Sequence, residues 1–407
     1  MTSEDSMIPS LDGCATPQLT REAQLSRSLK GFRDHEISLI EFILHPDQIA
    51  SLIYGQTFQN SMRSAFVGGL LAATDQLKDG FLAFAKALSD NKNIKLGGSL
   101  AVTHAEDGSK ALQRLRSFET GSLGDARTAL GLALVLVTYN DLSVGAPTLP
   151  ISRSALLQAM PWRQQLICST TEDTDPNIIC LLFVEVCECL VLGDLPIFRF
   201  EAPQKSTIVD RYYGICHELL PHLYDICHLY KSIKAGEVSD AERILFTDWI
   251  ASSVAEWTPE VILSQRENII VDEVEKHHFL LQARAFKSAT QLLLLQAQRT
   301  PLTDMLARSK AAQLDSQVQE VIQQGANRPK YLLFPYFVAC LELYEMNDKD
   351  VDEEILKTMN TISNGMAPKA CQSMSACLKH IRRNKQRKPG LSWFECVDKG
   401  LLIAMGP

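Results

Sequence analysis

The sequence predicts an all-α fold in which many helices pack as antiparallel hairpins within one large domain. Apolar residues recur at steps of three and four along almost the whole chain after residue 28, which is the spacing of one helix face. Two alternating runs of Val, Ile and Thr around an Asn-Gly or Asp-Gly turn, the usual signature of paired strands, do not occur. We therefore expect a single helical domain over residues 29–407, after a flexible tail of residues 1–28.

The hydrophobic pattern and its breakers give the predicted helices in order. The first apolar stretch, residues 39–44, ends at His45-Pro46, because a residue before proline is driven out of the helical conformation. Residues 61–89 place their apolar side chains on one face of a long helix, and Gly68-Gly69 predict a kink or a break in its middle. Further helices are predicted at 108–118, 122–141, 152–160, 177–192, 206–235, 240–257, 265–299, 309–324, 330–346, 351–363, 368–384 and 392–404. Loops are predicted where Gly and Pro gather, at 97–98, 145–147, 173–176, 193–196 and 327–329.

Composition excludes several classes of protein. The 40 Lys and Arg against 48 Asp and Glu give a formal charge of −8, so an overall positive field cannot hold nucleic acid. The longest apolar run, residues 129–137, is far shorter than the roughly 20 residues of a membrane-spanning helix, and the acidic N-terminus lacks the pattern of a signal peptide. We expect a soluble protein whose 11 cysteines are irregularly spaced, buried free thiols.

The best candidate for a metal site is the segment 213–230, which holds two Cys-His pairs. His217 and His222 are five residues apart with Pro221 between them, whereas a metal held from one helix face needs a spacing of four. Cys216 and Cys227 would lie about 16 Å apart on one helix face, too far for one zinc ion. We interpret this segment as a core helix.

Other candidate sites also fail on spacing. Cys187-Glu188-Cys189 has no second cysteine pair to complete a zinc site, and the acidic segment 347–354 lacks the Gly and the final acid of a calcium loop. The phosphate-binding glycine patterns and the G-x-S-x-G nucleophile pattern are missing from the sequence. We therefore predict no catalytic residues, no cofactor, no metal ligands and no enzymatic activity.

A basic run is the one strong charge signal. Residues 379–388 carry six cations, close a predicted helix and end at Pro389-Gly390. Two interpretations remain open: a helix C-terminus neutralised by cations, or a signal for nuclear import or phosphate contact. The residues of the predicted nuclear localisation signal are Lys379, Arg382, Arg383, Lys385, Arg387 and Lys388.

Several segments resemble the fungal-specific transcription factor domain, the all-α regulatory region of fungal binuclear zinc-cluster regulators. The segment 332–342, Leu-Leu-Phe-Pro-Tyr-Phe-Val-Ala-Cys-Leu-Glu, is similar to the family's Leu-Leu-Trp-Pro-Leu-Phe-x-Ala-Gly-x-Glu. It departs at Phe334, where the family has Trp, and at Cys340, where it has Gly. Further similarity lies in residues 47–89, 218–226 and 283–299, and the resemblance covers roughly residues 35–405.

The front of the sequence departs more strongly from that family. Its members usually begin with six cysteines that hold two zinc ions and present a short helix to DNA, but here only Cys14 precedes Cys168. One thiol cannot build that module, so direct reading of DNA bases is not implied. An upstream exon that encodes the module is the alternative, and transcript reads extending in frame past Met1 would test it.

The resemblance implies a nuclear regulator or co-regulator of transcription that acts through a DNA-bound partner, such as a related zinc-cluster protein, and that uses an import receptor. Control of a secondary-metabolite biosynthetic cluster is implied by the resemblance alone. Two other classes stay open: a cytoplasmic helical scaffold or small-molecule sensor, and an all-α isoprenoid-type enzyme. Magnesium-dependent turnover of a prenyl diphosphate would favour the enzyme.

Overall fold

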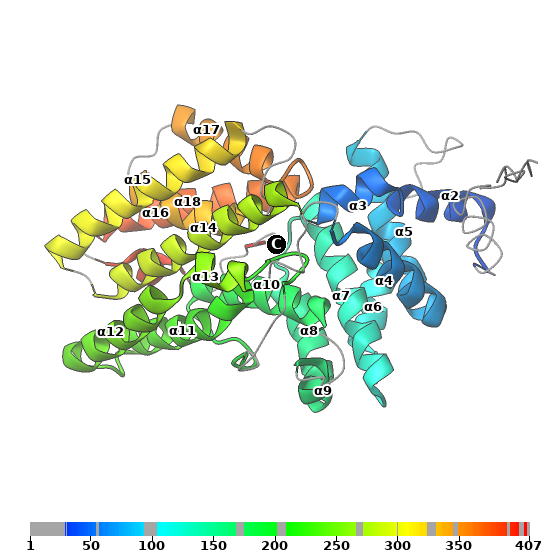
Figure 1. Ribbon diagram of the computed structural model, residues 1–407, viewed down its shortest axis with the longest axis horizontal. Helices are drawn as coiled ribbons and strands as arrows, with labels where there is room; N and C mark the ends of the chain where they lie inside the picture. The colour runs from blue at the N-terminus through cyan, green and yellow to red at the C-terminus, as the bar shows by residue number, and fades with distance from the viewer. Residues whose placement is uncertain are drawn as a thin grey trace, which may run out of the picture.

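The computed structural model describes residues 29, 31–53, 57–92, 104–167, 175–201, 209–265, 272–298, 300–323, 331–344, 349–388, 391–398 and 403–404. Within these ranges the regular elements are α-helices and short 3₁₀ turns, with one isolated bridge between Asp210 and Gly214, so the predicted all-α class is confirmed. Figure 1 shows two groups of helices, α2–α9 and α11–α18, that meet at α10. The predicted tail, Cys14, Cys168 and the loops at 97–98 and 327–329 lie outside the described residues.

The N-terminal group is built around α5, which contacts α2, α4, α6 and α7. Its elements are α2 (Asp34–Ile43), α3 (Pro46–Leu52), α4 (Gln59–Ala72), α5 (Thr74–Asn91), α6 (His104–Arg116), α7 (Leu123–Ser143), α8 (Leu149–Ala159), η1 (Met160–Trp162) and α9 (Arg163–Ile167). The predicted stop at His45-Pro46 is confirmed. His45 caps α3, and Pro46 occupies a first-turn position where no backbone N–H is needed.

The central helix α10 (Pro176–Leu192) is buried over its whole length from Ile178 to Val191 and contacts α7, α8 and α11. Its ends follow from the sequence. The Asp175 side chain accepts the N–H of Asn177, Pro176 opens the first turn, and Gly193 adopts a left-handed φ of 68° after the last turn.

The C-terminal group pairs consecutive helices side by side, with α14–α15, α15–α16 and α17–α18 in contact. Its elements are η2 (Cys216–Leu219), α11 (Leu220–Ala235), α12 (Asp240–Glu256), α13 (Pro259–Ser264), α14 (Glu273–Gln298), α15 (Pro301–Gln323), α16 (Leu333–Leu343), α17 (Lys349–Ile362), α18 (Pro368–Arg387) and η3 (Trp393–Cys396). The nine described cysteines are free and buried, as predicted. In the described part of the chain, no helix combines the length and apolarity needed to cross a membrane.

The predicted helix over 61–89 breaks, but at Ala73 rather than at Gly68-Gly69. Ala73 ends α4 and begins α5 with φ −138° and ψ 49°, outside the helical region. The break turns α4 back on α5, so that the rings of Phe66 and Phe81 lie 5.5 Å apart. In one continuous helix these residues would be about 22 Å apart, and their contact would be lost.

The predicted helix over 206–235 is wrong in its first half, because residues 210–214 form a tight turn. Asp210 and Gly214 exchange two backbone hydrogen bonds of 2.8 and 2.9 Å, and the Asp210 carboxylate accepts the N–H groups of Tyr212 and Tyr213. Gly214 has φ +56°, which a continuing helix cannot use. The helix α11 begins only at Leu220.

The predicted helix over 392–404 is also wrong, because η3 is one short turn. Ser392 and Glu395 cap it, and Trp393 and Phe394 are buried against Tyr230, with ring centroids 5.8 and 3.8 Å away. Two large aromatic side chains packed on one ring fix this segment in a turn, although its apolar spacing fits a helix. The predicted helix over 265–299 corresponds to α14, which begins at Glu273, and the short helix α13 before residue 265 was not predicted.

Replacement of Gly214 by Ala should destabilise the protein strongly. The added Cβ would lie 2.4 Å from a ring carbon of Phe279, at a φ that disfavours any side chain. We expect Gly214→Ala to lower the free energy of unfolding by about 3 kcal/mol in urea unfolding followed by circular dichroism. The control is Gly131→Ala within α7, where no atom lies within 4 Å of the new Cβ. Gly131→Ala should raise the free energy of unfolding by no more than about 1 kcal/mol. Equal losses in both variants would contradict the turn.

Candidate functional site

The predicted basic run lies on the second half of α18, and the structure divides it into two sets. Arg382 is only 3% exposed and donates to Asp352 of α17 at 2.8 Å. Lys379 lies 3.4 Å from the other oxygen of Asp352, and the Arg382 guanidinium lies over the Tyr344 ring. These two cations therefore hold α18 against α17 and α16.

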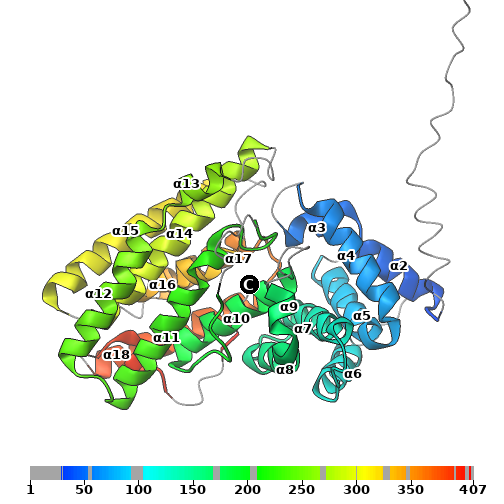
Figure 2. The same ribbon diagram turned by 60° about the horizontal axis from the view of Figure 1, so that its bottom comes forward.

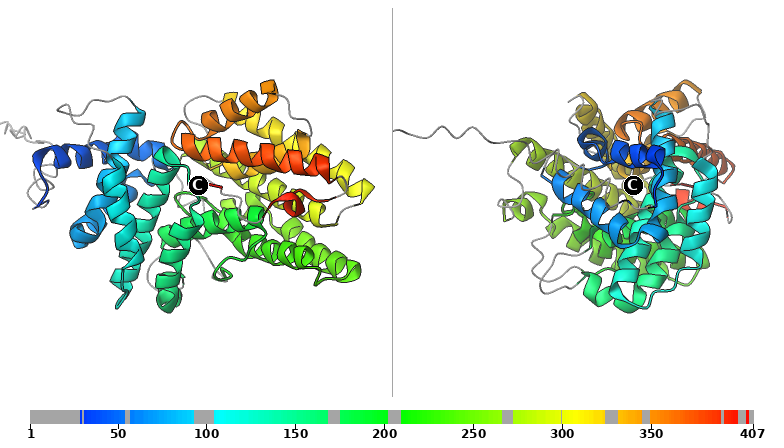
Figure 3. Two further views of the ribbon diagram at one scale, coloured as in Figure 1. Left: turned by 180° about the vertical axis from the view of Figure 1, so that it is seen from behind. Right: turned by 90° about the vertical axis from the view of Figure 1, so that its right-hand side faces the viewer.

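The other four cations are Arg383, Lys385, Arg387 and Lys388, at the C-terminal end of α18. Arg383, Arg387 and Lys388 are exposed and Lys385 is half-buried, and none forms an ion pair with a described residue. Figure 3 (left) shows α18, in orange and red, along the face turned to the viewer. The structure thus groups four cations of the predicted localisation signal on one accessible helix end and places two against acidic α17.

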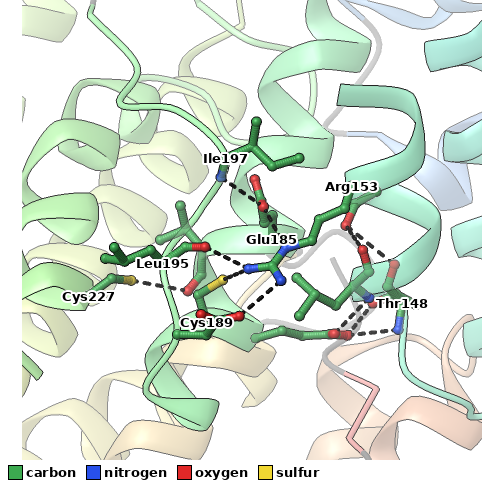
Figure 4. Close-up of polar contacts among 12 residues, drawn as sticks. Thr148, Arg153, Glu185, Cys189, Leu195, Ile197 and Cys227 are labelled. Carbon is green, nitrogen blue, oxygen red and sulfur yellow. Dashed lines mark hydrogen bonds and ion pairs between the residues drawn. The ribbon is translucent and has the colours of Figure 1, made fainter. Parts of the chain in front are cut away.

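A buried polar network joins α8, α10 and the loop after α10 (Figure 4). The Arg153 side chain donates to Glu185 at 3.0 Å, to the carbonyl oxygen of Leu195 at 2.6 Å and to the sulfur of Cys189 at 3.3 Å. It also pairs with Asp194 at 2.9 Å. Glu185 accepts a further hydrogen bond from the Ile197 N–H, so one guanidinium and one carboxylate fix the loop onto two helices.

A second glutamate of α10 caps another helix. Glu188 accepts the N–H groups of Thr148 and Leu149, at 3.0 and 2.7 Å, and the Thr148 hydroxyl. These N–H groups lie at the start of α8, where no helical partner exists for them and where a negative charge is favourable. In the sequence Glu188 stands out only as the middle residue of a Cys-x-Cys pattern, which does not predict that it caps α8.

The network is not suited to chemistry on a substrate. The Glu185 side chain is fully buried, and burial raises its pKa to about 7, against the opposing effect of Arg153. Burial also raises the pKa of the Cys189 and Cys227 thiols far above the usual value, so both stay protonated and poorly nucleophilic. We assign this cluster a structural role.

The candidate metal segment of the sequence is divided between two elements. His217 lies in η2, where its Nδ1 is 3.1 Å from the Gly214 carbonyl oxygen, whereas His222 lies half-buried in α11 with a pKa lowered by burial. Cys227 is buried beside α10, with its sulfur 3.8 Å from the Val186 carbonyl oxygen. Among the residues that the structure describes, no three His, Cys, Asp or Glu side chains are grouped to hold a metal ion.

Two exposed apolar stripes, one on α12 and one on α15, lie at the same end of the C-terminal group of helices. On α12, Leu245 and Trp249 are four residues apart and 71% and 53% exposed. On α15, Leu302, Met305 and Leu306 are 50–70% exposed and share one face. Gln298 at the end of α14 donates to Asp248 of α12, which brings the start of α15 near α12. Figure 2 shows both helices at this end.

These features define a helical domain with buried ion pairs and helix caps, whose accessible groups include two apolar stripes and a cationic helix end. The chain matches the family model described as the fungal specific transcription factor domain over residues 154–406, more than half of its length. The protein therefore belongs to this family of fungal transcription factor domains. No match is found among curated proteins or among solved structures.

The roles of Arg153, Glu185 and Asp352 were not predicted. A signal for Glu185 was present, because Glu185 and Glu188 interrupt an apolar segment too continuous to have a solvent face. Buried carboxylates need cations or N–H donors. The sequence alone does not show that Arg153 donates to Glu185 or that Asp352 accepts from Arg382, because the two members of these pairs are 32 and 30 residues apart in the chain.

Glu185 should make stability fall as the pH rises. Its proton is held up to about pH 7 in the folded state but is lost near pH 4.5 in the unfolded chain. Between these values the folded state binds more protons, so this group should lower the free energy of unfolding by up to about 3 kcal/mol. In urea unfolding across this range, Glu185→Gln should have a shallower dependence than the wild type, and exposed Asp90→Asn should not. Parallel curves for wild type and Glu185→Gln would refute the assignment.

Proposed function

We propose that this protein is a nuclear regulator of transcription that reaches DNA through a second, DNA-bound protein. Membership of the regulator family is the observation that carries the proposal. The formal charge of −8 supports an indirect rather than a direct contact with DNA. We propose that the genes it regulates form a secondary-metabolite biosynthetic cluster.

The partner that we propose is a related zinc-cluster protein, and the contact surface consists of the two apolar stripes of α12 and α15. Large apolar side chains that are more than half exposed are unfavourable in water unless a partner covers them. Trp249 stacks on Phe246 with ring centroids 5.6 Å apart, which presents a broad and rigid aromatic surface. Aromatic side chains of this kind often dominate the energy of protein contacts.

The nuclear import signal that we propose is carried by Arg383, Lys385, Arg387 and Lys388. These four cations lie within six residues at a helix end and form no ion pair with a described residue, so they offer a local positive charge on an acidic protein, although Asp398 pairs with the neighbouring His380 at 3.0 Å. Lys379 and Arg382 belong to the same run, but their contacts with Asp352 commit them to packing.

Replacement of these four cations by Ala should leave a tagged full-length protein in the cytoplasm. Arg382 is kept, because its loss would leave Asp352 without its closest buried partner and destabilise α18. The control replaces four exposed cations elsewhere, Arg116, Arg163, Lys357 and Lys369. Fluorescence microscopy should show a severalfold drop in the nuclear-to-cytoplasmic ratio only for the first variant. Unchanged nuclear accumulation would defeat the import assignment.

Charge placed on the apolar stripes should detach the protein from chromatin. In the parent fungus, Leu245→Glu with Met305→Glu should reduce chromatin immunoprecipitation of the tagged protein roughly tenfold, as expected for two central contacts. The control is Val144→Glu with Leu157→Glu, which changes side chains that are 52% and 58% exposed elsewhere.

A gel-shift assay with the DNA fragments enriched in that experiment distinguishes indirect from direct contact with DNA. The purified wild-type chain should not shift the enriched DNA fragments in a gel, with or without zinc. A zinc-dependent shift by the chain alone, or equal chromatin signals for both double variants, would overturn the proposed mechanism.

A further inference from the structure

An apolar cavity lies where segments far apart in the sequence meet. Its walls come from α3 and α4, from α7, from the turn before α11 and from the junction of α17 with α18. The centres of water-sized molecules can occupy about 70 Å³ of it, and all the space between its walls and at its open mouth amounts to about 750 Å³. Four of its lining side chains are aromatic, Phe66, Phe84, Tyr212 and Tyr331. A concave, largely apolar space with few polar groups is the usual form of a small-molecule site.

The hydroxyl groups that line the cavity already have partners. Ser51, Thr138 and Ser363 each donate to a backbone carbonyl oxygen three or four residues earlier, at 2.6, 2.9 and 3.2 Å. The phenol of Tyr212 donates to the Met62 sulfur of α4, and that of Tyr331 donates to a backbone carbonyl oxygen of α3. These groups need nothing from a ligand.

Asp141 is the exception. It lies on α7, lines the cavity and is 1% exposed, and neither of its carboxylate oxygens has a hydrogen-bond partner of normal geometry. The adjacent Asn140 amide is committed to both backbone groups of Ala146, at 2.6 and 3.2 Å. A buried polar group without a partner costs on the order of 1–3 kcal/mol, so its presence in a cavity wall calls for an explanation.

Burial raises the pKa of Asp141 well above its usual value, Glu188 of α10 adds to this effect, and the Asn140 side chain opposes it. This shift favours the protonated form of Asp141 when no cation lies beside it. The other titratable groups that interact with it electrostatically are the thiols of Cys180 on α10 and Cys371 on α18, whose pKa values are raised by burial. Both thiols stay neutral, and of these interacting groups Asp141 is the carboxyl that lines the cavity.

Backbone strain supports a functional interpretation. Tyr331 adopts φ +57°, a left-handed value that is costly for a bulky side chain. Its ring lies against those of Tyr212 and Tyr213, with centroids 5.9 and 5.3 Å apart. The surrounding contacts thus hold an aromatic side chain at the cavity at the expense of backbone energy, as is common at binding sites.

We propose that this cavity binds a small organic ammonium ion, a primary amine on a short apolar tail, with its nitrogen at Asp141. The carboxylate accepts charge-assisted hydrogen bonds from the ammonium group, and the aromatic side chains stabilise the cation and cover the tail. The proton that Asp141 holds in the empty protein passes to solvent when the cation enters. The ammonium group takes the place of the Asp141 proton, so the net charge of the buried site does not change.

Phenethylamine tests the proposal against two probes of similar shape, neutral phenethyl alcohol and anionic hydrocinnamate. By calorimetry on the full chain, the amine should bind at least about tenfold more tightly than the alcohol, as a charge-assisted hydrogen bond provides. Its affinity should rise with pH, by at most about tenfold per unit, because one proton is released per cation bound. Titrations in buffers of different ionisation enthalpy measure that released proton.

Asp141→Asn keeps the shape of the side chain but cannot pair with the ammonium, so it should lower the amine affinity at least about tenfold and leave the alcohol unchanged. Asp90→Asn, an exposed change on α5, should affect neither. Equal binding of amine and alcohol, tightest binding of hydrocinnamate, or amine binding without proton release would overturn the proposal. If Asp141→Asn fails to fold, the proton release of the wild type decides.

Discussion

The structure depends on a helix that is buried on every side and nevertheless carries two carboxylates. Because α10 packs between the N-terminal and C-terminal groups of helices, Glu185 and Glu188 cannot reach water. Arg153 compensates the first, and the N-terminal N–H groups of α8 compensate the second. Removal of one partner would leave a buried charge uncompensated, which costs several kcal/mol. The position of α8 and of the loop after α10 is therefore fixed by electrostatics as well as by apolar packing.

A centre that is held in this way leaves its surface free for recognition. The apolar stripes lie on α12 and α15, the cationic end lies on α18, and the Asp141 cavity lies where α7 meets the junction of α17 and α18. These are three separate places on one helical body. The partner, the import receptor and the small ligand that we propose would therefore not compete for the same side chains.

Most helices were predictable, because periodicity and caps are local properties. The 3.6-residue repeat and breakers such as Pro46 and Gly193 placed most helices correctly to within a few residues, and the apolar context of the cysteines predicted their burial. The failures at the described residues 209–219 and 392–398 have one cause. Buried turns carry the same apolar spacing as a helix when aromatic side chains such as Tyr213 and Trp393 pack into the core from irregular backbone.

The sequence by itself determined which faces are apolar, where helices stop, and that a dense cationic run closes α18. Only the tertiary structure decided which charges meet. Asp352 selects Lys379 and Arg382 from that run, Arg153 finds Glu185, and Asp141 is left in an apolar cavity without a partner. The reason is physical: hydrogen bonds and ion pairs depend on separations of about 3 Å in space, and a helical repeat carries no information on which two faces will come that close.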